Sequence, residues 1–239
     1  MAWGIGLFFV VVGAALQRVT GLGFALVSGP LLVLILNPFD GIVLANMLSG
    51  VVAAWIILRS YKFTNWAVAG KLCIGVVLGV PIGAAVVFTL DQSLLLIFVG
   101  AITAFAVMLV IMHKNIRVLG SKYGAVIAGL VSGFSNVTAG VGGPALAMYG
   151  VAQAMPMLVF IPTIQVVGFV TNVLSIAAKQ SISIELPMLL AAIGCVVVGL
   201  GLGTVLRRWI SGTAAQRLAL ILALGGSAAA VVRGVISLL

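Results

Sequence analysis

The hydrophobic pattern divides the chain into long stretches that carry no charged residue and no histidine. Most of these stretches approach the roughly 20 residues that a membrane-spanning helix needs. They lie at 19–39, 41–58, 72–90, 92–112, 123–178, 186–206 and 218–232. Hydrophobic and polar residues do not alternate within them, which argues against a β-barrel. The pattern therefore predicts an all-α integral membrane protein.

Two polar, glycine-containing breaks interrupt this pattern where a membrane span is usually most uniform. They are "QRVTGLG" at 17–23 and "SNVTAGVGG" at 135–143. Dividing the chain there gives ten helical pieces, at 3–17, 22–36, 42–58, 67–90, 93–112, 123–134, 144–155, 161–178, 186–206 and 217–238. A piece of about fifteen residues reaches only about 22 Å, short of a hydrocarbon core of about 30 Å. Each set of five pieces is therefore predicted to open with a broken helix or a hairpin.

A shift of 119 residues aligns the two breaks and several positions that follow them. The matching positions are Gln17 and Asn136, Gly21 and Gly140, Gly23 and Gly142, Asn46 and Gln165, Thr64 and Ser183, and Gly75 and Gly194. The segment "GVVLGVPIG" (75–83) also resembles "GCVVVGLGLG" (194–203) when one residue is inserted. We interpret this as a duplication, so that one membrane domain, 1–239, contains two repeats, 3–112 and 123–238.

The composition supports the membrane class. The chain is 64% hydrophobic and 6% charged, with a mean hydropathy of +1.39, whereas soluble domains carry about 25% charged residues. No basic flank precedes the first apolar stretch, so we expect a retained helix rather than a secretory signal, in a multi-pass protein of the cytoplasmic membrane. Cys73 and Cys195 lie far apart within apolar stretches and are expected to be small buried hydrophobic residues. No metal or cofactor is expected.

The formal net charge of +9 is interpreted as a signal of topology rather than of nucleic-acid binding, because basic residues in short loops mark the cytoplasmic side. If each break is a hairpin, the two halves are inverted in the membrane, and nine basic residues fall inside: Arg59, Lys62, Lys71, Lys114, Arg117, Lys122, Arg207, Arg208 and Arg217. Lys179 and Arg233 then fall outside. If each break is part of one crossing, the halves are parallel and the basic residues divide 8 against 3. The charge pattern favours inversion, and leaves open whether the hairpins span fully or re-enter.

The breaks are the candidate substrate site. Broken helices at membrane depth persist only where they are buried in protein or line a wet cavity, and matching breaks in two inverted halves point to a transporter's binding site. The helices that begin after Gly23 and near Pro144 would aim free N–H groups into the breaks, which favours an anion. The alternative is that Gly142 and Gly143 only permit tight helix crossing. The predicted site comprises Gln17, Arg18, Thr20, Gly21, Gly23, Asn46, Ser135, Asn136, Thr138, Gly140, Gly142, Gly143 and Gln165.

Three of these residues have two interpretations each. Arg18 is a fixed cation near the midplane if the first hairpin re-enters, with a planar fork suited to an oxyanion, or a cytoplasmic loop charge if the hairpin spans fully. Asn46 and Gln165 either line the same cavity or hold helices together by hydrogen bonds. Asn172 lies on the same helix face as Gln165, seven residues further along.

Several functional classes have no support in the sequence. No acidic residue lies within a predicted span, so a carboxylate proton relay has no candidate. Walker, H-E-x-x-H and Cys/His patterns are absent, and no GxSxG is followed by plausible partners, so we do not expect an enzyme.

At its breaks the chain resembles the TauE/SafE (sulfite exporter) family of membrane transporters, whose two similar halves each open with a glycine-rich stretch of the form GVGGG. "GVGGP" (140–144) is similar to that motif and "GLGFALVSGP" (21–30) is a looser match, with Phe24 in place of a third glycine. "KFTNW" (62–66) is similar to the pattern that often precedes the next helix in that family. The resemblance implies transport of sulfite, thiosulfate, sulfonates or similar small anions.

We therefore predict a secondary carrier for a small anion in the lipid bilayer, in which two inverted halves bring their breaks together and alternate access. A passive anion channel and a non-transporting membrane scaffold subunit are the alternatives. The sequence is compatible with a homo-oligomer.

Overall fold

The computed structural model describes residues 2–21, 24–112, 117–179 and 184–238. All secondary structure in these ranges is helical, which confirms the all-α prediction. Each half of the chain contributes five α-helices. The first five are α1 (Ala2–Thr20), α2 (Phe24–Ile35), α3 (Pro38–Ser60), α4 (Trp66–Thr89) and α5 (Gln92–Met112). The second five are α6 (Gly124–Ala139), α7 (Gly143–Ala152), α8 (Met157–Lys179), α9 (Leu186–Leu206) and α10 (Gly212–Ile236). Short 3₁₀ turns at Tyr61–Phe63 and Arg117–Gly120 complete the described structure.

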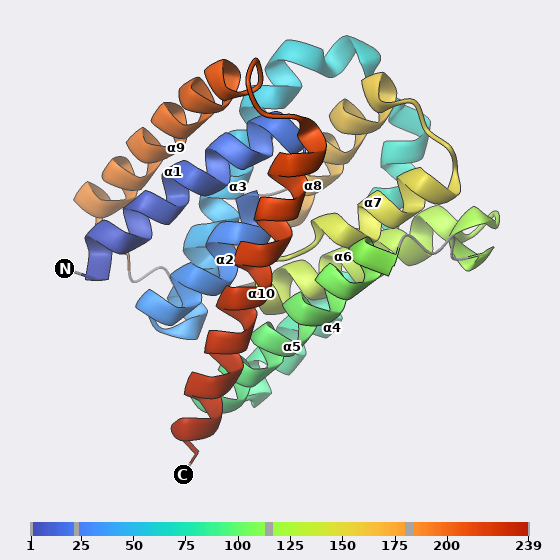
Figure 1. Cartoon of the computed structure of the whole chain (residues 1–239). Helices are drawn as coiled ribbons and strands as arrows, with labels where there is room; N and C mark the ends of the chain where they lie inside the picture. The colour runs from blue at the N-terminus through green and yellow to red at the C-terminus, as the bar shows by residue number, and fades with distance from the viewer. Residues whose placement is uncertain (1, 22–23, 113–116, 180–183, 239) are drawn as a thin grey trace.

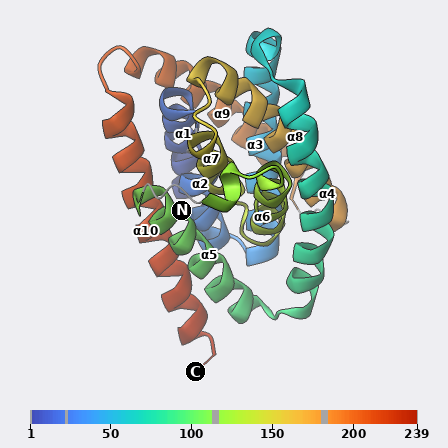
Figure 2. The same ribbon diagram turned by 90° about the vertical axis from the view of Figure 1, so that its right-hand side faces the viewer.

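Seven of these helices are long and apolar enough to cross a membrane, so the chain is a multi-pass membrane protein. The other three, α2, α6 and α7, have 12, 16 and 10 residues. At 1.5 Å per residue they reach roughly 18, 24 and 15 Å, each shorter than a hydrocarbon core of about 30 Å. In Figure 2 these short helices lie in the middle of the molecule, with α10 on one side and α4 on the other.

Both breaks are narrower than the sequence suggested, because polar residues placed in them continue the preceding helix. The helix α1 runs to Thr20 and α6 runs to Ala139. Each ends at a glycine in the left-handed conformation, Gly21 at φ 76° and Gly140 at φ 73°, which glycine adopts without the steric cost of a Cβ. Serine and threonine fit the last turn of a helix by bonding back to their own helix carbonyls. The two left-handed glycines occupy matching positions of the proposed repeat.

Close backbone contacts join the first helix of each half to the fourth helix of the other half. A Cβ added at Gly79 of α4 would overlap the carbonyl oxygen of Leu130 on α6, and one added at Gly199 of α9 would overlap that of Val11 on α1. Such contacts need glycine because any side chain would separate the two backbones. Gly79 and Gly199 correspond in the proposed repeat once the inserted residue is counted, and so do Leu130 and Val11.

The same pattern of close contacts continues one turn further along both helix pairs, α4 with α6 and α1 with α9, which we call the glycine seams. A Cβ at Gly83 would lie 2.9 Å from the Phe134 carbonyl oxygen, and one at Gly203 would lie 2.5 Å from that of Ala15. Figure 1 shows one of these pairs, with α9 of the second half running beside α1 of the first half. Further contacts between the halves join α3 to α8, α5 to α10, α4 to α8 and α2 to α10. The orientation of the two halves across a bilayer stays a prediction.

The connections between helices fall on two edges of the molecule. Those between α3 and α4, α7 and α8, and α9 and α10 lie along the upper edge of Figure 1, while both termini and the turn between α4 and α5 lie along its left and lower edges. Arg59 lies in the last turn of α3, and Arg207 and Arg208 directly follow α9. Cys73 and Cys195 are free and only partly buried, and each packs against the margin of a hydrophobic cluster.

Candidate functional site

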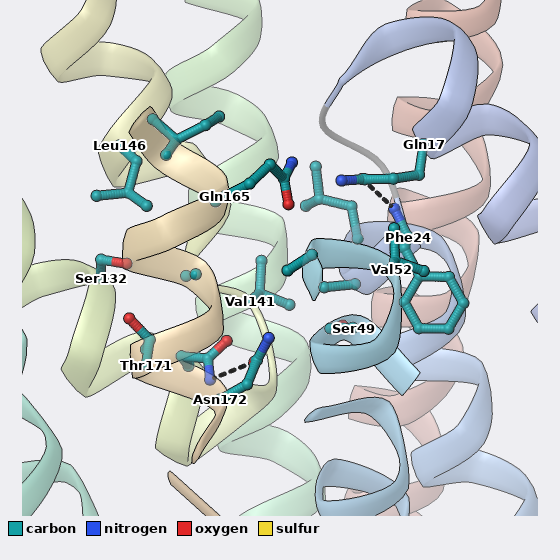
Figure 3. Close-up of a pocket in the computed structure, with 18 residues that line it drawn as sticks. Gln17, Phe24, Ser49, Val52, Ser132, Val141, Leu146, Gln165, Thr171 and Asn172 are labelled. Atoms are coloured by element: carbon teal, nitrogen blue, oxygen red, sulfur yellow. Dashed lines mark hydrogen bonds between the residues drawn. The ribbon is translucent and has the colours of Figure 1, made fainter. Parts of the chain in front are cut away.

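A cavity of about 80 Å³ lies where the two breaks come together (Figure 3). Four parts of the chain form its wall: the first break, α3, the second break and α8. The lining residues are Gln17, Phe24, Ala25, Leu26, Ser49, Val52, Ala53, Ser132, Asn136, Val141, Gly142, Gly143, Leu146, Ile164, Gln165, Gly168, Thr171 and Asn172. This volume suits a small ion with some water, since one water occupies about 30 Å³ in the liquid.

A buried amide cluster forms one end of this cavity. The Asn136 Nδ2 amide lies 3.1 Å from Asn46 Oδ1, 3.2 Å from Asn172 Oδ1 and 3.1 Å from Ser175 Oγ. All four residues are at least 95% buried. An amide nitrogen has two hydrogens, so it serves at most two of the three acceptors by full hydrogen bonds at one time. The cluster ties α6 to α3 and α8 directly behind the cavity wall.

A second set of amides closes the first break. Gln17 Oε1 accepts the Phe24 N–H at 2.9 Å, which caps the start of α2, and Gln17 Nε2 lies 3.2 Å from the Gly21 carbonyl oxygen. Gln165 on α8 donates to the same oxygen at 3.2 Å. In Figure 3 the Gln17 and Gln165 side chains point toward one another from opposite walls. The two sets share one arrangement. Asn46 on α3, the third helix of the first half, bonds to Asn136 in the second break, and Gln165 on α8, the third helix of the second half, bonds to Gly21 in the first break.

Two hydroxyl groups on the wall have no hydrogen-bond partner among the described residues. They are Ser132 Oγ, on a residue that is 1% exposed, and Ser49 Oγ. The Nδ2 amide of Asn46, which lies behind the wall, is also unpaired in the described structure. Buried polar groups are nearly always hydrogen-bonded, and leaving a donor unpaired costs about 1–3 kcal/mol. The cavity therefore keeps donors available for a ligand.

Two helix N-termini reach the cavity from opposite sides. The wall includes the first residues of α2 and the residues around the start of α7. Pro144 lies in the first turn of α7, where its missing N–H costs no hydrogen bond. The free N–H groups of a helix N-terminus carry about half a positive unit charge. Among the described lining residues none is charged, so the cavity offers an anion neutral donors and partial charges.

Five predicted site residues line the cavity: Gln17, Asn136, Gly142, Gly143 and Gln165. Asn46 contacts it through Asn136. A Cβ at Gly142 would lie 2.9 Å from the Ser132 carbonyl oxygen, so glycine there lets α7 start close against α6. Gln165 and Asn46 both bond helices together, and of the two only Gln165 is among the described residues that line the cavity.

The other predicted residues lie elsewhere. The Thr20, Ser135 and Thr138 hydroxyls bond back to the Leu16, Val131 and Phe134 carbonyls at 2.8, 2.6 and 2.7 Å. Gly140 forms the turn that ends α6. Thr20 and Gly21 line a second cavity of about 280 Å³, and Gly23 is outside the described residues.

Arg18 does not line the cavity. Its Nε donates to Thr204 Oγ1 at 3.2 Å, and its guanidinium lies 5.3 Å from the centre of the Trp55 ring, which Arg59 also covers at 4.2 Å. The reason is helical geometry: neighbouring residues point about 100° apart, so when Gln17 faces the cavity Arg18 faces α9 and α3.

Sequence reasoning missed Ser49, Ser132 and Thr171, and named Asn172 only as a neighbour of Gln165. Helical spacing would have found some of them. Ser49 lies three residues after Asn46, so it shares a helix face with a predicted amide. Thr171 lies six residues after Gln165 and does not share the face of that amide. Ser132 lies one turn before Asn136 on α6.

Comparison with known proteins gives one match. The model of the family described as "Sulfite exporter TauE/SafE" matches residues 5–230. No curated protein and no solved structure matches the chain.

Proposed function

The chain belongs to the TauE/SafE sulfite exporter family, and on that premise we propose that it is a secondary carrier for a small oxyanion of the sulfite or sulfonate type. It resides in the cytoplasmic membrane and works by alternating access between two inverted halves. The anion binds in the cavity between the breaks, where Gln165 and Ser132 donate hydrogen bonds, Asn136 lines the wall, and the N-termini of α2 and α7 supply partial positive charge.

The observation that carries this proposal is the unpaired Ser132 hydroxyl, buried in the wall of a cavity that both breaks share. A purely structural contact between helices would have paired or excluded this hydroxyl. A site for an apolar ligand would not have gathered amides, hydroxyls and helix N-termini on one wall. An anion uses all of these groups at once.

The second cavity supplies a route to one side of the membrane. It is lined by Thr20, Gly21 and residues of the connection between α7 and α8. In Figure 1 this connection lies along the same edge as those that follow α3 and α9, the helices that end beside the basic residues Arg59 and Arg207. Basic loops mark the cytoplasmic side, so this cavity is the cytoplasmic approach. The hydrogen bond from Gln165 to the Gly21 carbonyl stands between the two cavities. Releasing that bond would join them, and the glycine seams would keep α1 with α9 and α4 with α6 during the movement.

Replacing Ser132 by alanine is expected to raise the KM for sulfite counterflow in proteoliposomes by roughly tenfold to a hundredfold, because a hydrogen bond to a charged partner contributes about 1.5–3 kcal/mol. The matched control is Ser227→Ala on α10, which removes a hydroxyl that is equally buried, at 1% exposure, but bonds to the Leu224 carbonyl. That variant should keep the wild-type KM. Equal KM values for the two variants would remove Ser132 from the site.

The same assay separates a carrier from the alternatives. If unlabelled sulfite on the far side of the membrane does not accelerate the flux of labelled sulfite, the protein is a passive channel. If there is no flux, a scaffold is favoured.

Arg18→Gln is expected to leave the KM for sulfite within about twofold of wild type, because Arg18 contacts Thr204 and Trp55 rather than the cavity. A long-range Coulomb contribution from an exposed charge is small and screened by salt. The same counterflow assay measures it, at low and at physiological salt. A KM increase of more than tenfold at both salt concentrations would restore Arg18 as a substrate-binding charge.

A further inference from the structure

The charge of the cavity between the breaks decides which anions it accepts. Its described lining contains amides, hydroxyls, backbone groups and apolar side chains, and no charged side chain. The helices α2, α6 and α7 carry no charged residue at all. Among the groups on adjacent helices, Arg18 bonds to Thr204, Arg59 covers Trp55 and Lys179 lies 5.3 Å from the centre of the Phe39 ring. Tyr149 on α7 is buried but does not line the cavity.

The positive charge that remains at the wall comes from the two helix N-termini. Each supplies the equivalent of about half a unit charge, so together they match about one negative charge. The unpaired Ser132 hydroxyl is the independent sign that a ligand occupies this place, since it is almost fully buried and has no partner in the described structure. A second negative charge would be left without compensation in a poorly solvated site, where uncompensated charge is strongly disfavoured.

We infer that the cavity selects monovalent anions and discriminates against divalent ones, so that hydrogen sulfite rather than the sulfite dianion is the bound form. This inference rests on the proposed function and adds the charge class of the substrate. Sulfite interconverts between the two forms around neutral pH, whereas methanesulfonate stays monovalent and sulfate stays divalent there. Comparing the three ligands therefore distinguishes an effect of anion charge on affinity from an effect of anion shape.

The test is calorimetric titration of the purified chain in nanodiscs with methanesulfonate, sulfate and sulfite, one pH unit below and one above neutrality. Methanesulfonate should bind with the same Kd at both values. Sulfite should bind about tenfold more weakly at the higher pH, because the apparent Kd rises as the competent fraction falls. Sulfate should bind at least about tenfold more weakly than methanesulfonate at both values.

A charge added to the wall should reverse the preference. Ser49→Lys replaces an unpaired hydroxyl of the cavity wall by one cation. This variant is expected to shift the sulfate-to-methanesulfonate affinity ratio toward sulfate by about tenfold or more. Ser49→Gln, which adds similar length without charge, should leave the ratio unchanged.

The outcomes separate the two proposals. If no member of the panel binds, the proposed function fails. If sulfate binds wild type as tightly as methanesulfonate, or if sulfite binds more tightly at the higher pH, the charge inference is overturned and anion transport stands. The wild-type panel decides this even if Ser49→Lys does not fold.

Discussion

Replacing Asn136 by aspartate is expected to abolish anion transport. The change keeps the size of the side chain but exchanges the Nδ2 donor for a carboxylate oxygen, which then faces the Asn46 and Asn172 oxygens. A carboxylate within about 4 Å of a bound anion costs about 4 kcal/mol at an effective dielectric constant of about 20. This corresponds to a loss of roughly a thousandfold in kcat/KM, measured as initial sulfite flux in proteoliposomes.

The control for this variant is the same exchange at an exposed position. Asn65 caps α4 by accepting the Val68 N–H at 3.1 Å, and aspartate caps helices equally well. Asn65→Asp should therefore keep wild-type flux and thermal stability. Flux from Asn136→Asp above a tenth of wild type, with correctly folded protein by circular dichroism and gel filtration, would contradict an anion site at the amide cluster.

Gly79→Ala is expected to cause a large loss of stability. The added methyl would overlap the Leu130 carbonyl oxygen and lie 2.9 Å from its carbonyl carbon, so α4 and α6 must separate. Alanine by itself favours a helix by about 1 kcal/mol over glycine, but an overpacked contact costs about 1–3 kcal/mol or more, and here the obstacle is backbone that cannot rotate away. The thermal midpoint of the purified protein should fall by several degrees.

A matched substitution on the same helix separates packing from helix propensity. Gly70 has no atom within 4 Å of the place where a Cβ would lie, so Gly70→Ala should leave the midpoint unchanged or raise it slightly. Gly79→Ala should also lower sulfite flux, because α6 carries Ser132 and Asn136 into the cavity wall. Equal midpoints for the two variants would show that the seam between α4 and α6 tolerates separation.

A neutral cavity suits a carrier, which must release its substrate as well as bind it. A site with fixed cations would hold an oxyanion strongly and slow its departure, whereas binding that is favourable but modest allows rapid turnover. Hydrogen bonds from amides and hydroxyls on four different parts of the chain also respond to small shifts between helices. A movement that separates α8 from the first break would remove the Gln165 contact and weaken binding at the same time.

The sequence located the helices well because their signals are local. All ten described helices begin within five residues of their predicted starts, and α9 is predicted at its observed bounds, 186–206. Apolar length, loop charges and glycine at a left-handed turn all act within a few residues. Thr20, Ser135 and Thr138 lie outside the cavity between the breaks for a local reason as well: a hydroxyl in a polar break and a hydroxyl bonded to its own helix look alike in the sequence.

The sequence by itself determined that this chain is an all-helical membrane protein with two glycine breaks, because a long apolar stretch has one low-energy form in lipid and a left-handed turn favours glycine. Only the tertiary structure decided which polar side chains share the cavity. That choice depends on helix rotation and crossing, which bring Asn46, Asn136 and Asn172 together from three helices and direct Arg18 away. Rotation is set by packing between helices distant in the chain, such as Gly79 on Leu130, and no local pattern encodes it.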